Sequence, residues 1–279
     1  MKDIYRSERS RQLIEQWCRG RLDAWAVPHQ RRVIAASGST THLVIAGSGA
    51  QTALFVPGTN FSAASCLPLA TALAERCRVV LVDVPGQPGL SSGRRIPAPQ
   101  RQSWYGRWLA EVIDEITEFP VVLAGHSLGA AIAMATGSPL VSRQVLLSPG
   151  GLVRARITPG ILAASMSWLL RRRPTDSAQL LGTMLAPGHR PRPELVEWMT
   201  LVARHVRSSL DPAGAVVADQ QVDRVVVVGD HDRYFPSKPL ARAVRHTLDR
   251  PLSVLPSAGH LLIEEHPDHI AGLISGSPR

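Results

Sequence analysis

The most constraining feature of this chain is the largely apolar stretch of residues 121–136, which is interrupted by the pentapeptide Gly-His-Ser-Leu-Gly at residues 125–129. Residues 121–124 form a short, apolar and partly β-branched segment, which is typical of a strand buried on both faces of a sheet. Residues 128–136 contain helix-forming residues without strand-like alternation. Ser127 is therefore predicted to lie on a tight turn between a strand and a helix.

Such a turn has a chemical consequence for the serine. The glycines on either side of Ser127 leave room where a Cβ atom would collide with neighbouring backbone. The turn pushes the hydroxyl group out at the end of the sheet and directs the N–H of Leu128, with the start of the helix, to the same point. Because the five-residue pattern also arises by chance, the prediction of a nucleophile requires support from elsewhere in the chain.

A serine hydroxyl needs a base, and the base needs a carboxylate that orients it. Residues 224–229 indicate a second buried strand, and Asp230 and Asp232 follow it directly. Residues 252–255 indicate another strand, which leads into His260 at the start of a helical segment. His260 is the predicted base, and either aspartate is a candidate acid. The other histidines lack this strand-to-helix setting, and His126 lies on the same tight turn as the serine.

Four separate motifs, in this order along the chain, resemble those of the α/β-hydrolase superfamily. They are the Asp-x-x-Gly loop at residues 83–91, with one extra residue between its glycines, the elbow at 125–129, the acid segment at 229–232 and the Gly-His pair at 259–260. The resemblance runs from about residue 33 to residue 274. The family order of nucleophile, acid and base corresponds to Ser127, Asp232 and His260.

The resemblance also implies roles for individual residues. The family spacing of three residues after a glycine favours Asp232 over Asp230, which is then expected to cap a turn. The oxyanion hole is expected to consist of the backbone N–H groups of Leu128 and Thr59. Many family members have His-Gly where this chain has Pro57 and Gly58, which departs from the usual loop. An ordinary turn in which Asn60 caps the next helix is compatible with the same residues.

The expected fold is an α/β fold with a mostly parallel, eight-stranded type of sheet and a helical cap inserted between strands 6 and 7. Residues 1–150 and 220–279 are assigned to the core, and residues 151–219 to the cap. A hairpin over 32–46 and strands over 53–56, 79–83, 121–124, 144–148, 224–229 and 252–255 are predicted, with core helices over 4–26, 62–75, 104–117, 128–136 and 261–265. Cap helices are predicted over 161–173, 176–185 and 194–210, the last with an apolar face of Leu195, Trp198, Met199, Val202 and Val206.

Composition limits the alternatives. The 279 residues are 44% hydrophobic and 19% charged, which suits one globular domain with an insertion. The three cysteines have no spacing typical of disulfides or zinc sites. The net charge of +9 is carried almost entirely by scattered arginines, and the one cluster, 171–173, ends a helical pattern, so nucleic-acid binding is not expected. Without an apolar run of about 18 residues or a leader, a cytoplasmic protein without a membrane span is expected.

The expected activity is hydrolysis of a carboxylic ester, or a related acyl bond, in a largely apolar small molecule through an acyl-enzyme intermediate. The chemistry requires neither a metal nor an organic cofactor. A thioesterase, a lactonase or a cyclising acyltransferase would use the same triad with other acceptors. A ligand-binding protein that has the fold without turnover is the alternative of another class. The sequence does not define the substrate or the oligomeric state.

Overall fold

The computed structural model describes residues 3–97, 100–208 and 216–276. In these parts of the chain, eight strands form one sheet in the order β1-β2-β4-β3-β5-β6-β7-β8. The pairs that involve β2 are antiparallel and the other neighbouring pairs are parallel. The strands are β1 His29–Ala36, β2 Ser39–Ala46, β3 Thr52–Val56, β4 Arg78–Val82, β5 Val121–His126, β6 Val141–Leu147, β7 Asp223–Gly229 and β8 Leu252–Leu255. The predicted fold class is confirmed.

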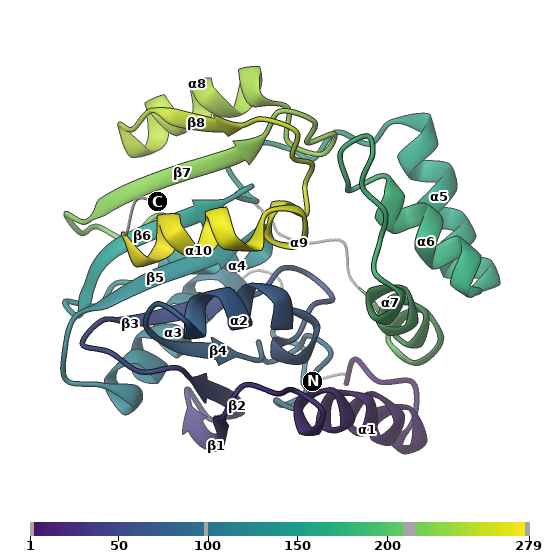
Figure 1. Cartoon of the computed structure of the whole chain (residues 1–279), viewed down its shortest axis with the longest axis horizontal. Helices are drawn as coiled ribbons and strands as arrows, with labels where there is room; N and C mark the ends of the chain where they lie inside the picture. The colour runs from purple at the N-terminus through teal and green to yellow at the C-terminus, as the bar shows by residue number, and fades with distance from the viewer. Residues whose placement is uncertain (1–2, 98–99, 209–215, 277–279) are drawn as a thin grey trace.

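Helices cover both faces of the sheet. Alternate residues of β3 enter different hydrophobic clusters, Phe55 with one layer of helices and Leu54 with the other, as the two-residue repeat of a strand requires. In Figure 1, α2, α9 and α10 lie in front of the sheet, and α3 and α4 lie behind it. The helices outside the cap are α1 Glu8–Asp23, α2 Leu67–Ala74, α3 Arg101–Ile116, α4 Leu128–Ala135, α8 Ser237–Leu248, α9 Leu262–Glu265 and α10 Pro267–Ser275, with a 3-10 turn, η1, at Ala63–Ser65.

Three helices lie between β6 and β7, where the cap is predicted. They are α5 Pro159–Arg171, α6 Pro174–Gly182 and α7 Pro193–His205. They lie beyond the ends to which the parallel strands point, and α1 runs beside α7 (Figure 1). The indole rings of Trp17 and Trp198, whose centroids are 4.7 Å apart, join these two helices. The third helix ends at His205, earlier than predicted, because Val206 is extended and forms an antiparallel bridge with Tyr5. The predicted end at Leu210 lies outside the described residues.

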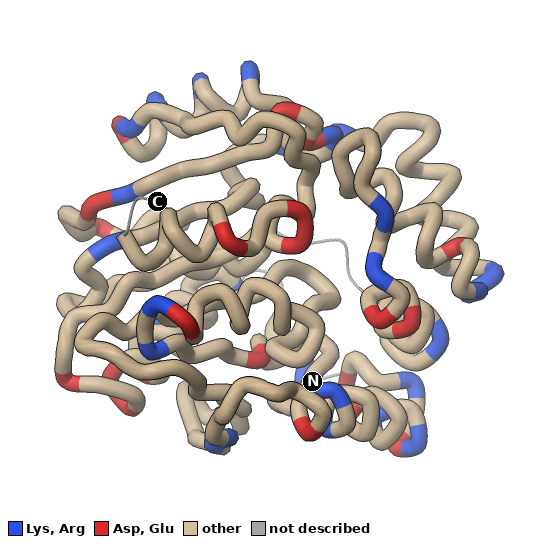
Figure 2. The backbone as a smooth tube through the Cα atoms, viewed as in Figure 1, with Lys and Arg blue, Asp and Glu red and all other residues tan. Residues whose placement is uncertain are grey.

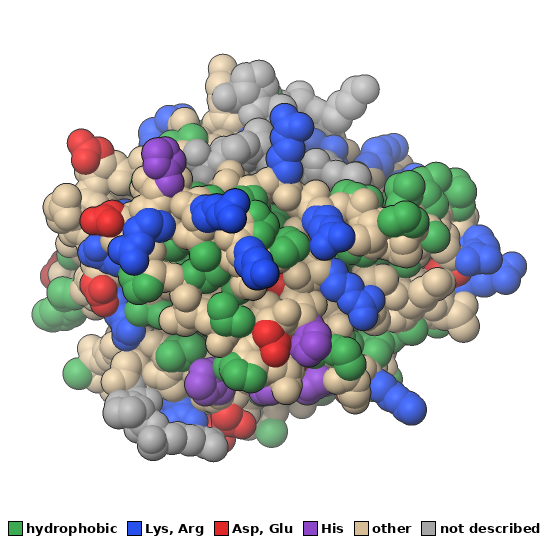
Figure 3. All heavy atoms as spheres, turned by 90° about the horizontal axis from the view of Figure 1, so that it is seen from above, with side chains coloured by type: hydrophobic (Ala, Val, Ile, Leu, Met, Phe, Trp, Pro, Cys, Tyr) green, Lys and Arg blue, Asp and Glu red, His purple; other side chains and the backbone are tan. Residues whose placement is uncertain are grey.

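The cap helices differ in how far their apolar side chains are buried. The predicted stripe of α7 is fully buried, from Leu195 to Val206. Helix α5 buries Trp168 on one side and exposes Leu162 and Leu170 on the other, and hydrophobic side chains gather at this end of the molecule in Figure 3. At the C-terminus of α5, the Nε of Arg172 donates to the carbonyl of Leu169, which is the predicted helix-end role of the arginine cluster.

Two predicted helices are shorter than expected. The helix predicted over 62–75 is divided into η1 and α2, because Pro68 has no N–H and is tolerated only in the first turn of a helix. Asn60 does not cap it: the turn begins after Ser62, whose N–H donates to Ser65 Oγ at 2.9 Å. The N-terminal helix predicted over 4–26 begins at Glu8, since Ser7 accepts the N–H of Ser10 and ends the preceding extended segment.

Charged residues are spread along the backbone, both around the sheet and in the helices between β6 and β7, and Asp and Glu positions lie among those of Lys and Arg (Figure 2). None of the helices in the described parts of the chain combines the length and the apolar character that a membrane crossing would require.

The glycine after the elbow serine should tolerate no side chain. A Cβ at Gly129 would lie 2.0 Å from the carbonyl oxygen of Val56 and 2.7 Å from that of Pro57, both backbone atoms that cannot rotate away. We expect Gly129→Ala to lower the free energy of unfolding by about 3 kcal/mol or more, measured by urea denaturation.

The matched control is Gly20→Ala in α1, where a Cβ meets no atom within 4 Å. This variant should gain up to about 1 kcal/mol from helix propensity. Equal stability of the two variants would contradict the close approach of α4 to β3.

Candidate active site

The parallel strands bring the predicted site residues to one edge of the sheet. Thr59, Ser127, Asp232 and His260 each lie in the segment that follows the carboxyl end of a strand, namely β3, β5, β7 and β8. Backbone hydrogen bonds tie the segments after β5, β6 and β7 to the next strand: Ser127 N–H donates to Leu147 at 2.9 Å, Ser148 N–H to Val227 at 2.8 Å and Asp230 N–H to Leu255 at 3.0 Å. The position of each of these loops therefore depends on the strand beside it.

Ser127 has an unusual backbone conformation. Its φ of 52° and ψ of −108° lie in a region that residues with a side chain rarely adopt. The predicted strand-turn-helix is present, with β5 ending at His126 and α4 beginning at Leu128. Because the first N–H groups of a helix have no acceptor within the helix, the N–H of Leu128 is directed toward the space in front of the turn. This arrangement suits the stabilisation of an anion beside the serine.

His260 and Asp232 form a buried hydrogen bond. Nδ1 of His260 lies 2.9 Å from Oδ2 of Asp232, and the two side chains are 9% and 0% exposed. The other carboxylate oxygen accepts the N–H groups of Tyr234 and Phe235 at 2.8 and 2.9 Å. Burial opposes ionisation of Asp232, but His260 and these hydrogen bonds outweigh it, so the pKa of Asp232 lies below its usual value. The carboxylate is thus ionised and holds the Nδ1 proton of His260.

Asp230, the other candidate acid, has a different set of contacts. Its side chain is 37% exposed, and Oδ1 accepts the N–H of Ala258 at 3.1 Å. Desolvation is outweighed by hydrogen bonds from the backbone of Ser257 and Ala258, and the pKa of Asp230 is lowered. Asp230 therefore holds the loop before His260, whereas Asp232 contacts the imidazole.

His126 contacts His260, which the sequence analysis missed. Nε2 of His126 donates to the carbonyl oxygen of His260 at 2.8 Å, and the ring centroids are 5.0 Å apart. Burial, aided by the neighbouring His260, lowers the pKa of His126 to about 3, so this imidazole is neutral. The two residues are 134 positions apart, and no local pattern in the sequence links them.

Aromatic side chains surround His260. The rings of Tyr234 and Phe235 lie 5.2 and 5.4 Å from the imidazole, centroid to centroid. The hydroxyl of Tyr234 is 2.8 Å from Oγ1 of Thr183, which follows α6 of the cap. The only sequence signal for Tyr234 and Phe235 is that they lie two and three residues after Asp232. Their contacts restrict the imidazole to a narrow range of orientations.

The loop that carries Thr59 is held from two sides. The N–H of Asn60 donates to Gln87 Oε1 at 2.9 Å, and its carbonyl accepts from Trp198 Nε1 of α7 at 2.7 Å. Below the loop, the buried carboxylate of Asp83 accepts the N–H groups of Ala63 and Leu90 at 2.7 and 2.9 Å. The motif of residues 83–91 thus fixes the Thr59 loop, although Pro57 replaces the residue usual in the family.

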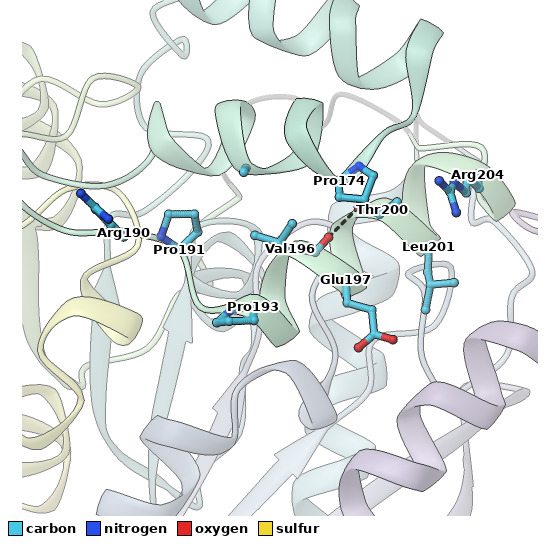
Figure 4. Close-up of a pocket in the computed structure, with 10 residues that line it drawn as sticks. Pro174, Arg190, Pro191, Pro193, Val196, Glu197, Thr200, Leu201 and Arg204 are labelled. Atoms are coloured by element: carbon cyan, nitrogen blue, oxygen red, sulfur yellow. Dashed lines mark hydrogen bonds between the residues drawn. The ribbon is translucent and has the colours of Figure 1, made fainter.

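A cavity lies among the helices between β6 and β7. It has a volume of about 640 Å³ and is lined mainly by α7, with Pro174 and Ala178 of α6 and residues 190–191 of the connection between the two helices (Figure 4). Val196 and Leu201 are among its lining residues, with Arg190 near one end and Arg204 near the other. None of the five predicted site residues lines it. Within the described residues, no group of three or more His, Cys, Asp or Glu side chains is placed to hold a metal ion.

Comparison with known proteins identifies the family. Residues 53–272 match the model of the alpha/beta hydrolase family. The chain belongs to the alpha/beta hydrolase family. No curated protein sequence matches it.

Solved structures of other alpha/beta hydrolases have the same fold. A putative hydrolase from Bacillus subtilis has a TM-score of 0.80 and 19% identity and is aligned over 96% of this chain and 98% of its own. Carboxylesterase CesB from the same organism has a TM-score of 0.76 and 18% identity, over 95% and 97% of the two chains. The naproxen esterase of Bacillus subtilis has a TM-score of 0.73 and 18% identity, over 93% and 94%. At these identities, the likeness establishes the fold alone.

The neutral His126 should make stability depend on pH. Its pKa is about 3 in the folded chain and about 6.5 when unfolded, so the unfolded state binds the proton more readily between these values. Stability from this group is complete above about pH 6.5 and falls by up to about 1.4 kcal/mol per pH unit below it. Urea denaturation at several pH values measures this slope.

The control is His126→Gln, which keeps a side-chain N–H donor and does not titrate. Its free energy of unfolding should fall less steeply between about pH 6.5 and about pH 4 than that of the native protein. Parallel curves would show that His126 is protonated equally in both states.

Proposed function

We propose that the protein is a serine hydrolase that cleaves a carboxylic ester, or a related acyl bond, of a largely apolar small molecule through an acyl-enzyme intermediate. The observation that carries the proposal is the buried 2.9 Å hydrogen bond between His260 and Asp232, at the same sheet edge as the strained turn of Ser127. A carboxylate on Nδ1 leaves Nε2 as the proton acceptor of the imidazole.

In the proposed mechanism, Nε2 of His260 takes the proton of the Ser127 hydroxyl as its oxygen attacks the substrate carbonyl. Asp232 keeps the imidazole in the required tautomer and stabilises the imidazolium that forms. His260 then gives the proton to the leaving alcohol. In the second half of the reaction, His260 activates water, which attacks the acyl-enzyme and releases the acid.

The negative charge of the tetrahedral intermediate falls on the former carbonyl oxygen. We assign the N–H groups of Leu128 and Thr59 to this oxyanion, as donors from the start of α4 and from the loop after β3. The positive end of the α4 dipole lies at the same place. Pre-oriented backbone donors are effective because they need no reorganisation as the charge develops.

The proposed preference for an apolar acyl group rests on the helices beyond the sheet edge. We assign residues 151–219 to a cap over the site, with residues 1–150 and 220–279 as the core. The cap helices are rich in Leu, Met and Trp. Two structurally similar proteins are a carboxylesterase and a naproxen esterase, which supports ester chemistry in this fold.

The nucleophile can be tested with a fluorophosphonate probe, which reacts with activated serines. The native protein should be labelled at Ser127, and Ser127→Ala should lose labelling and reduce the turnover of chromogenic esters by several orders of magnitude. Ser253→Ala, an exposed serine of β8, is the control and should retain both. Labelling or full turnover in folded Ser127→Ala would refute the proposed nucleophile.

The two aspartates should differ in kind of effect. Asp232→Asn favours the wrong tautomer of His260 and should lower kcat on the order of 10⁴-fold with the fold preserved. Asp230→Asn weakens the hydrogen bonds that Asp230 accepts from the turn at residues 256–258. It should cost about 0.5 to 2 kcal/mol of stability with kcat largely retained. Steady-state kinetics and urea denaturation of both variants separate these effects, and the reverse ranking would assign the acid to Asp230.

A further inference from the structure

Glu265, in α9, links the loop of His260 to the cap. Its carboxylate accepts two backbone N–H groups, that of Gly259 on Oε2 at 2.7 Å and that of Ala186 on Oε1 at 2.6 Å. Gly259 directly precedes His260, and Ala186 lies in the connection between α6 and α7. Hydrogen bonds to an ionised acceptor are short and stronger than those between neutral groups. One carboxylate thus holds two segments that are distant in the sequence.

The two segments also pack directly on each other. A Cβ at Gly259 would lie 2.4 Å from the carbonyl oxygen of Met184 and 2.7 Å from the nitrogen of Ala186. On the other side of His260, the N–H of Leu261 donates to the same Met184 oxygen at 3.1 Å. The cap segment of residues 184–186 therefore contacts the backbone immediately before and after His260. The Glu265 carboxylate binds both of these segments.

The adjacent Glu264 reaches the cap without touching this loop. Its side chain is 6% exposed and pairs with Arg192, whose Nε lies 2.7 Å from Oε2. Burial raises the pKa of Glu264 against the opposing effect of Arg192. Both glutamate side chains thus attach the cap to α9, and of the two only that of Glu265 also binds the backbone beside His260.

We propose that Glu265 is a positioning residue for His260. Its carboxylate fixes the backbone next to the histidine and holds the cap segment 184–186 against that backbone. Three contacts then define the histidine: Asp232 on Nδ1, His126 on the carbonyl oxygen, and Glu265 on the preceding N–H. A proton acceptor must be placed accurately, because a displacement of about 1 Å can cost on the order of 100-fold in rate. The effect on turnover rests on the proposed hydrolase function.

The experiment compares Glu265→Gln with Glu264→Gln. A glutamine amide presents one oxygen and one NH₂ group. Either the N–H of Gly259 or that of Ala186 would then face a donor instead of an acceptor. We expect Glu265→Gln to lower kcat for a chromogenic ester by about 10- to 100-fold with KM within about threefold of the native value. Glu264→Gln should instead lower the urea midpoint and leave kcat within about threefold. Glu265→Asp keeps the charge but reaches only one donor, and should be intermediate in kcat.

A second readout is independent of turnover. The low-field proton resonance of His260 Nδ1–H, which reports the hydrogen bond to Asp232, should broaden or shift in Glu265→Gln and stay unchanged in Glu264→Gln. An unchanged resonance and kcat in Glu265→Gln, or equal losses of kcat in both variants, would overturn the positioning role. A native protein that does not react with the fluorophosphonate would refute the hydrolase function, and the resonance would still decide the role of Glu265.

Discussion

The contact between the elbow and β3 is the constraint on which the site geometry depends. The backbone of Gly129 packs against the carbonyl group of Val56, and the backbone of Gly125 packs against that of Gly129. Neither glycine position has room for a Cβ. This approach forces α4 to begin directly at the end of β5 and forces Ser127 into a φ of 52°, a strain of about 1 to 3 kcal/mol. The bond from Ser127 N–H to Leu147 then connects the strained turn to β6.

The two histidines at the site are distinguished by the oxygen that each one contacts. His260 binds a carboxylate through Nδ1, and a carboxylate can stabilise the positive charge that forms when an imidazole accepts a proton. His126 binds a carbonyl oxygen, which does not compensate for lost hydration, and burial lowers its pKa to about 3. Two imidazoles 5.0 Å apart can therefore have separate roles, one in proton transfer and one in holding the backbone.

The sequence predicts those parts of the fold whose signal is local. Short apolar runs ended by polar loops predicted the core strands, and the pentapeptide around Ser127 predicted the turn. Contacts across the chain carry no such signal: the choice between Asp230 and Asp232 needed the family spacing, and the bond between His126 and His260 was not predicted. The division of the helix after Ser62 was missed because the helix-forming character of 62–75 obscured the effect of Pro68. Proline and tertiary contacts override propensity in such places.

Several hydrogen bonds of the cap end on the loops that carry the proposed machinery. Trp198 binds the carbonyl of Asn60, next to Thr59; Thr183 binds Tyr234, two residues after Asp232; and Met184 accepts the N–H after His260. A cap that only selected substrate could be attached anywhere on the sheet edge. Because these attachments coincide with the loops that we propose to supply the oxyanion hole, the acid and the base, a shift of the cap would displace all three. Substitutions that reshape the cap for a new substrate are therefore constrained by the same contacts that orient the site.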